Sequence, residues 1–215
     1  MKKLITYPEL LSKILARSED FISNPSLFKI RSFIEGYDFA TKGCCPNREF
    51  YRGFNFWVAE RYFVKTTHDW QSIISFEAGS EAEAIKLAKQ LWHEYLETQA
   101  LGASVQNCFI EAENLTSTKT SDLFEILQER PTLYIGHASV TGIRSFLAGY
   151  TFARQIAGIK EDDLLYTQFS SWTANRFNKA VSHQWDEIVS FMGISESGAF
   201  ALMKDLWNEY KSGLG

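Results

Sequence analysis

The chain has 215 residues, a net charge of −4 and an aromatic content of 15%, supplied by 17 Phe, 9 Tyr and 6 Trp. Aromatic side chains bury roughly 150–250 Å² each, so the sequence can build a large core, and this excludes a disordered protein. The acidic balance lacks the excess of basic residues on which general nucleic-acid binding depends. It suits a basic partner instead.

The first eleven residues, MKKLITYPELL, hold two lysines and only a short apolar stretch, which is interrupted at residues 6–9. This start predicts neither a secretory signal nor a membrane span. The cysteines are odd in number, at Cys44, Cys45 and Cys108, which is typical of reduced thiols rather than disulfides. We therefore expect a cytoplasmic protein.

Residues 30–40, IRSFIEGYDFA, predict an amphipathic helix. Their apolar residues follow the i, i+3, i+4, i+7 spacing of one helix face: Ile30, Phe33, Ile34 and Tyr37. Gly36 lies inside this pattern, where glycine costs roughly 1 kcal/mol relative to alanine. We expect that the close approach of a neighbouring helix compensates for this cost.

Three further segments follow in the first half: FNFWVAER at residues 54–61, HDWQSIISF at 68–76 and LAKQLWHEY at 87–95. The last belongs to a predicted helix that starts at Ser80, because SEAE is a capping-box pattern in which Ser80 and Glu83 satisfy free backbone donors.

All four segments return in the second half in the same order. Residues 143–153, IRSFLAGYTFA, are identical to residues 30–40 at eight of eleven positions, at an offset of 113. The other three return at an offset of 115, as FSSWTANR, HQWDEIVSF and LMKDLWNEY. This repetition predicts a tandem duplication, with a first domain at 1–97, a linker at 98–120 and a second domain at 121–215. Because alternating strand patterns are missing, we predict an all-α fold with about five helices in each copy.

Three kinds of polar residue occur in both copies: Arg61 with Arg176, His68 with His183, and Glu94 with Glu209. An acid, a base and a cation are the components of general acid–base catalysis. However, Arg61 follows Trp57 by four residues, so its stem can pack on the indole while its head meets Glu94. We interpret the set as a structural polar network and expect no catalytic residue. Metal-ligand spacings and phosphate-binding glycine loops are missing from the sequence, so no metal or cofactor is expected.

The second half contains ERPTLYIGHASVTGIRSFLAGYTFA at residues 129–153, followed by FSSWTANRF and HQWDEIVSF. This order of an RPxxYxG segment, an FLxGY helix and a WxxxR segment resembles small helical bacterial immunity proteins of polymorphic or contact-dependent toxin systems. The first half departs from the pattern, because Ser18 stands where the second half has Pro131. The resemblance implies a non-enzymatic protein that binds and neutralises a cognate toxin.

If the toxin has a basic cleft, we expect it to meet the acidic segments that the two copies do not share. These segments contain Glu161, Asp162 and Asp163 in the second copy and Glu111 and Glu113 in the linker. Two other functions stay open. One is an enzyme with a site between the lobes that uses the repeated Arg, His and Glu, and the other is a helical adaptor or scaffold.

Overall fold

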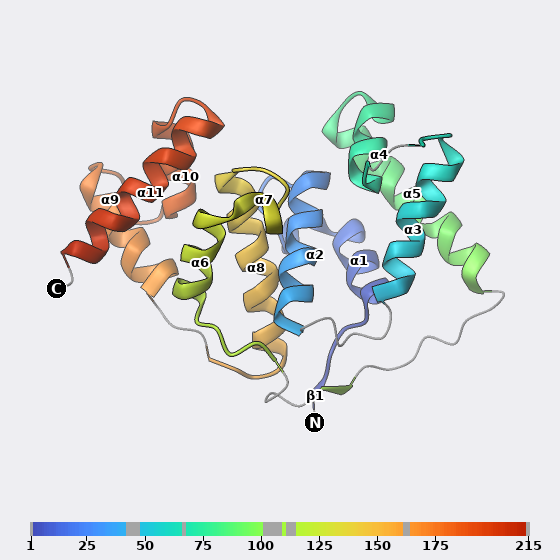
Figure 1. Cartoon of the computed structure of the whole chain (residues 1–215), viewed down its shortest axis with the longest axis horizontal. Helices are drawn as coiled ribbons and strands as arrows, with labels where there is room; N and C mark the ends of the chain where they lie inside the picture. Colours follow the sequence, from blue (N-terminus) through green and yellow to red (C-terminus); the bar gives the residue numbers. More distant parts are fainter. Residues whose placement is uncertain are drawn as a thin grey trace.

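The computed structural model describes residues 2–41, 48–65, 68–100, 109–110, 115–160 and 164–213. Within these residues the fold is all-α, as predicted, apart from one short antiparallel strand pair (Figure 1). In this pair β1 (Lys2–Lys3) lies against β2 (Phe109–Ile110), with Lys2 opposite Ile110. No described helix is both long and apolar enough to cross a membrane.

The helices of the first half are α1 (Tyr7–Ala16), η1 (Ser18–Asp20), α2 (Leu27–Thr41), α3 (Arg48–Arg61), α4 (Trp70–Ala78) and α5 (Glu81–Ala100). Those of the second half are α6 (Thr120–Glu129), α7 (Pro131–Tyr134), α8 (Val140–Ile156), η3 (Leu164–Phe169), α9 (Ser170–Arg176), α10 (Trp185–Met192) and α11 (Glu196–Ser212). Figure 1 shows α2 and α8 side by side at the centre, with α3–α5 on one side and α9–α11 on the other. The two halves therefore meet through their central helices.

Local sequence accounts for several helix starts. Thr6 and Glu9 form a reciprocal capping box at the start of α1, which satisfies backbone donors that have no partner inside the helix. Ser80 accepts a hydrogen bond from the backbone N–H of Glu83 at 3.3 Å, which is one half of the capping box that the sequence predicted. Pro131 occupies the first turn of α7, a position where proline loses no helical hydrogen bond.

The glycines of the repeated central helix lie where α2 and α8 cross. A Cβ atom on Gly36 would overlap the backbone carbonyl of Phe146, and a Cβ atom on Gly149 would overlap that of Phe33. Phe33 and Phe146 are themselves paired by the sequence repeat, so the contact is reciprocal. The expected close approach to a neighbouring helix is confirmed, and the neighbour is the repeated counterpart.

Each half packs the same aromatic trio on the outer side of its central helix. In the first half the ring of Phe54 lies edge-on to Trp92, with centroids 4.9 Å apart, and contacts Tyr95 at 5.4 Å. In the second half Phe169 contacts Trp207 at 5.0 Å and Tyr210 at 5.4 Å. Both trios belong to one cluster of buried side chains that runs through the two halves.

The end of the predicted linker is built into this fold. Leu115 is 2% exposed, and the backbone N–H of Thr116 donates to the carbonyl of Ala40 at 2.9 Å. The Tyr150 hydroxyl, on α8, donates to the carbonyl of Thr118. Residues 115–119 therefore pack against both central helices before α6 begins, while the proposed division into domains stays a prediction.

Candidate functional site

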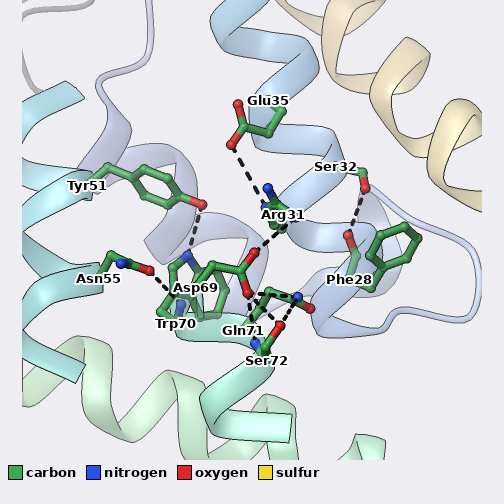
Figure 2. Close-up of polar contacts among 10 residues, drawn as sticks. All are labelled: Phe28, Arg31, Ser32, Glu35, Tyr51, Asn55, Asp69, Trp70, Gln71 and Ser72. Carbon is green, nitrogen blue, oxygen red and sulfur yellow. Dashed lines mark hydrogen bonds and ion pairs between the residues drawn. The ribbon is translucent and has the colours of Figure 1, made fainter. Parts of the chain in front are cut away.

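A polar cluster lies where the start of α2 meets α3 and α4 (Figure 2). Arg31 of α2 forms an ion pair with Asp69, Nη1 to Oδ2, at 3.0 Å, and a longer one with Glu35 at 4.0 Å. Beside this pair the Tyr51 hydroxyl accepts a hydrogen bond from the indole N–H of Trp70 at 2.9 Å. The repeated arginine thus joins the central helix to the outer helices of its own half.

Hydrogen bonds fix the charge of Asp69 at the N-cap of α4. Its carboxylate accepts from Ser72, from the backbone N–H at 3.1 Å and the hydroxyl at 2.7 Å, and from Gln71 Nε2 at 3.0 Å. Burial alone would raise the pKa of Asp69, but the Ser72 hydrogen bonds and the Arg31 charge outweigh burial and hold the pKa below its usual range. Burial raises the pKa of Tyr51, so its phenol stays neutral.

The cluster opens to a pocket of about 440 Å³. Its lining includes Asp69, Trp70 and Tyr51, together with Phe56 of α3, which is 74% exposed. Since the carboxylate and the phenol already have hydrogen-bond partners within the protein, this site has the character of a structural cluster with an open edge.

The second half builds a related cluster with its carboxylate in a different place. The sequence Asp69-Trp70-Gln71 aligns with Gln184-Trp185-Asp186, so acid and amide have exchanged positions around the shared tryptophan. Gln184 is the N-cap residue of α10, and its backbone N–H donates to Glu187 Oε2 at 3.2 Å, so Asp186 has no capping role.

Arg144, the counterpart of Arg31, follows this exchange. Its Nε lies 3.4 Å from Asp186 Oδ1, and its guanidinium lies over the ring of Tyr166 at 4.8 Å from the centroid. Asp186 Oδ1 is buried and accepts no hydrogen bond within the described residues, although the ion pair supplies opposite charge. The second cluster is thus less completely satisfied than the first.

Asp186 lines a pocket of about 270 Å³, here called the junction pocket because residues of both halves form it. The first half contributes Phe21, Ile22, Ser23, Asn24 and Lys29, and the second half contributes Thr141, Arg144, Ser145, Ala148, Gln184, Asp186, Glu187 and Ser190. Burial raises the pKa of Asp186, opposed by the Arg144 charge, and burial lowers the pKa of Lys29, opposed by Asp186 and Glu196. The pocket lining therefore includes two cations, Lys29 and Arg144, and two carboxylates, Asp186 and Glu187.

The two carboxylates should show opposite effects of pH on stability. Because its pKa is lowered by folding, the charge of Asp69 stabilises the fold above the ordinary value near 3.9, and this contribution is lost as the pH falls. Folding raises the pKa of Asp186, because burial and the charge of Glu187 outweigh the charges of Arg144 and Lys29. The fold therefore loses stability as the pH rises from the ordinary pKa of an aspartate to the raised pKa of Asp186. We expect Asp69→Asn to destabilise at neutral pH and Asp186→Asn to leave stability equal or higher. Urea unfolding from about pH 3.5 to about pH 7.5 measures both. If both substitutions lower the free energy of unfolding at neutral pH, the predicted contrast is wrong.

The polar residues that the sequence singled out fall into two surface pairs. Arg61 Nη2 lies 2.8 Å from Glu94 Oε2, and the guanidinium carbon of Arg61 lies 5.2 Å from the centroid of the Trp57 ring. Arg176 Nε lies 3.1 Å from Glu209 Oε1. The four side chains are 32–54% exposed. Pairs this exposed typically contribute about 0–1 kcal/mol to stability.

The two histidines do not join these pairs. His183 Nδ1 lies 3.4 Å from Glu187, and His68 is exposed next to Asp69, the N-cap residue of α4. The arginine pairs and the histidines therefore do not converge on an inter-lobe site.

The predicted acidic binding residues lie outside the described residues: Glu161, Asp162, Asp163, Glu111 and Glu113. The sequence analysis did not predict the residues that the structure does bring together, Arg31 with Asp69 and Arg144 with Asp186. Apolar spacing describes only one face of a helix, and both arginines lie outside that face. One signal was available, since the two arginines are identical residues within the strongest repeated block.

Comparison of the chain with protein-family models, curated proteins and solved structures gave no match. Within the part of the chain that the structure describes, no group of three or more His, Cys, Asp or Glu side chains is arranged to hold a metal ion.

Proposed function

We propose that the protein binds another protein through apolar side chains exposed at the ends of its outer helices. The first tip is defined by Phe63 after α3 and Phe76 at the end of α4, which are 88% and 85% exposed. The second tip is defined by Phe191, Met192 and Ile194 at the end of α10, and Phe191 and Ile194 are 75% and 97% exposed. In Figure 1 the ends of α4 and α10 lie on the same side of the molecule, which suits engagement of one partner by both tips.

The backbone of Ile194 carries this proposal. Ile194 adopts a left-handed φ of 64°, which is rare for a β-branched residue, while the aligned position in the first half is Gly79 at 73°. Phe63 shows the converse pattern, with a φ of 55° where the second half has Asn178 at 51°. Each half thus has a bulky apolar residue in a strained position that its counterpart fills with a tolerant one. Backbone strain of about 1–2 kcal/mol at residues whose apolar side chains are exposed supports a role in recognition.

Both tips are held to the central helices by equivalent glutamates. Glu81 accepts a hydrogen bond from the backbone N–H of Leu27 at 3.3 Å, and Glu196 accepts one from that of Val140 at 2.7 Å. Fixing the tips in advance lowers the entropy that is lost when a partner binds.

Within this class of function, we infer that the partner is a toxin and that the protein is its immunity protein. The net charge of −4 favours association with a basic protein surface, such as that of a toxin acting on nucleic acid or nucleotides. The order of motifs in the second half adds the resemblance to immunity proteins. We further infer that a tandem duplication produced the two halves, and the reciprocal Gly36 and Gly149 contacts support this origin.

Replacing Ile194 with glycine tests the proposed function. Because Gly79 occupies the aligned position, Ile194→Gly should keep the fold, with a free energy of unfolding equal to wild type or about 1 kcal/mol higher. Affinity for the protein encoded by the neighbouring reading frame should fall at least about tenfold, since a buried anchor residue typically contributes 2 kcal/mol or more. Titration calorimetry and urea unfolding give the two quantities.

The control is Lys204→Ala, on the exposed side of α11, which should change neither quantity. Phe191→Ser should weaken binding as Ile194→Gly does. Unchanged affinity in both tip variants would show that the tips are not the binding surface. If wild-type protein neither binds the neighbouring product nor protects cells that express it, the immunity function itself is wrong.

A further inference from the structure

We propose that a hollow in the first half receives an arginine side chain of the protein partner, with the guanidinium held between the Phe56 ring and the Glu60 carboxylate. The inference rests on the proposed function, because the arginine belongs to the partner. The hollow lies between α3 and α5, has a volume of about 540 Å³ and is here called the outer hollow. Figure 1 shows α3 and α5 at one side of the molecule, away from the crossing of α2 and α8. The residues that line the outer hollow are Glu49, Phe50, Gly53, Phe56, Trp57, Glu60, Tyr95 and Gln99.

Phe56 and Glu60 are both accessible to a partner. The Phe56 ring is 74% exposed, and Glu60 is exposed as well. The two residues are four positions apart on α3, so their side chains are neighbours on one helix face. Within the described part of the chain Glu60 forms no ion pair, whereas Glu49 Oε1 lies 3.1 Å from Arg52 Nη1. Glu60 is thus the carboxylate of the lining that can pair with a cation from outside.

A ring beside a carboxylate is an arrangement that binds guanidinium groups. The planar guanidinium stacks on an aromatic face and donates hydrogen bonds to carboxylate oxygens, and arginine is better suited to this than lysine. None of the described lining residues is a lysine, an arginine or a histidine. The lining therefore offers rings and negative charge without a cation of its own.

The chain itself contains an arginine held in this way, next to the outer hollow. The guanidinium carbon of Arg61 lies 5.2 Å from the centroid of the Trp57 ring, and Arg61 Nη2 lies 2.8 Å from Glu94 Oε2. Phe56 directly precedes Trp57 on α3 and presents a second ring beside a second glutamate. Among the described residues no cation lies over the Phe56 ring, so this second position is open to an arginine of the partner.

The second half keeps the tryptophan and the tyrosine of the lining but lacks the two groups that would hold the guanidinium. Ser171 and Asn175 occupy the positions of Phe56 and Glu60. A hydroxyl and an amide supply neither a ring face nor a negative charge. The proposed arginine site is therefore specific to the first half.

Gly53 keeps the floor of the outer hollow open. A Cβ atom at this position would overlap the hydroxyl of Tyr95, which donates to the carbonyl of Phe50 at 3.0 Å. In the second half Gln168 occupies the aligned position, and its Oε1 atom accepts from the Tyr210 hydroxyl at 3.4 Å. Space, ring and charge thus occur together only in the first half.

The outer hollow adjoins the first tip. The Glu60 carbonyl accepts a hydrogen bond from the backbone N–H of Phe63 at 3.1 Å, so the residue that supplies the charge also belongs to the turn that carries the tip. A partner that covers Phe63 therefore brings its own side chains close to Glu60. Because the net charge of −4 favours a basic partner, an arginine is the side chain expected there.

The first experiment needs no partner protein. N-acetyl-L-arginine amide is titrated into the full chain up to about 100 mM at constant ionic strength, and the indole N–H signals are followed by nuclear magnetic resonance. We expect the signal of Trp57 to shift and that of Trp172, its counterpart in the second half, to stay in place. N-acetyl-L-citrulline amide, which has nearly the same shape and no charge, should shift neither signal. Glu60→Gln and Phe56→Ser should each reduce the shift of Trp57 at least about threefold.

The second experiment measures binding to the protein encoded by the neighbouring reading frame. Glu60→Gln should raise the dissociation constant at least about fivefold, and the effect should shrink as salt rises because the attraction is electrostatic. Phe56→Ser should raise the dissociation rate by about the same factor. Asn175→Ala, at the position equivalent to Glu60, is the matched control and should bind like wild type. All three side chains are exposed, so the variants should keep the wild-type melting temperature.

Three results would each overturn the inference: the arginine probe leaves the Trp57 signal in place, the citrulline probe shifts that signal equally, or Glu60→Gln and Phe56→Ser both bind the partner like wild type. The last result would leave the proposed function intact. If the wild-type protein does not bind the neighbouring product but the arginine probe shifts Trp57 in a manner that depends on Glu60, the proposed partner is wrong and the outer hollow still binds arginine.

Discussion

Gly36→Ala is expected to destabilise the protein by about 3 kcal/mol or more, the upper end of the range for overpacking a core. The added Cβ atom would overlap the backbone carbonyl of Phe146, and a backbone carbonyl has no rotamer by which to move aside. Relief therefore requires α2 and α8 to separate along their crossing, which would open the contact at the centre of the fold. For a chain of this length, a loss of 3 kcal/mol lowers the melting temperature by about 6–12 °C.

Gly149→Ala provides an internal replicate, because its Cβ atom would meet the carbonyl of Phe33 in the same way. Gly213→Ala is the control: Gly213 ends α11 with an ordinary φ of −83°, and a Cβ atom there would lie 3.6 Å from the nearest carbonyl. Calorimetric melting curves of the three variants compare them directly. Should Gly36→Ala melt within a degree or two of Gly213→Ala, the close crossing of α2 and α8 would be wrong.

The central helices show how far the sequence alone leads. Apolar spacing predicted a helix at residues 30–40, and the interior glycine predicted that another helix would approach it. The sequence could not identify that helix as α8, because the spacing of one helix describes its own face and carries no record of the opposing surface. The repeat supplied the missing information only in part, since two copies of a helix can pack on each other or on separate neighbours.

The polar clusters were harder to predict for a related reason. Arg31 meets Asp69, 38 positions later in the chain, only after α3 and α4 have folded back, and local periodicity does not describe such a pair. The exchange of Asp69-Trp70-Gln71 for Gln184-Trp185-Asp186 was visible as letters, but its consequence depends on which residue caps the helix. In the first half the carboxylate of Asp69 caps a helix and accepts hydrogen bonds there. In the second half the carboxylate of Asp186 has no capping role.

The left-handed residues could not be predicted at all from composition or spacing. Isoleucine and phenylalanine are among the residues least expected at positive φ, so no sequence pattern predicts a left-handed backbone at Ile194 or Phe63. Their positions become apparent once Gly79 and Asn178 are seen to fill the same turns in the other half. Two halves with a repeated sequence can thus be compared position by position, and the positions where they differ in backbone strain point to residues with a separate role.

Phe54→Ala and Phe169→Ala are each expected to cost about 3–5 kcal/mol, since each removes the central ring of one aromatic trio and leaves a cavity among Trp and Tyr side chains. Both variants should still unfold in one transition, with equal loss of hydrogen-exchange protection in α2 and α8. The reason is that the buried cluster runs through both halves and the central helices share its middle, so neither half retains a complete core when the other unfolds. Calorimetry and hydrogen exchange measured on the same samples test this. If Phe169→Ala lowered protection only in α9–α11 and produced a second, earlier transition, the halves would be separately folding domains, and the reciprocal glycine contact would be a docking interface rather than the centre of a single fold.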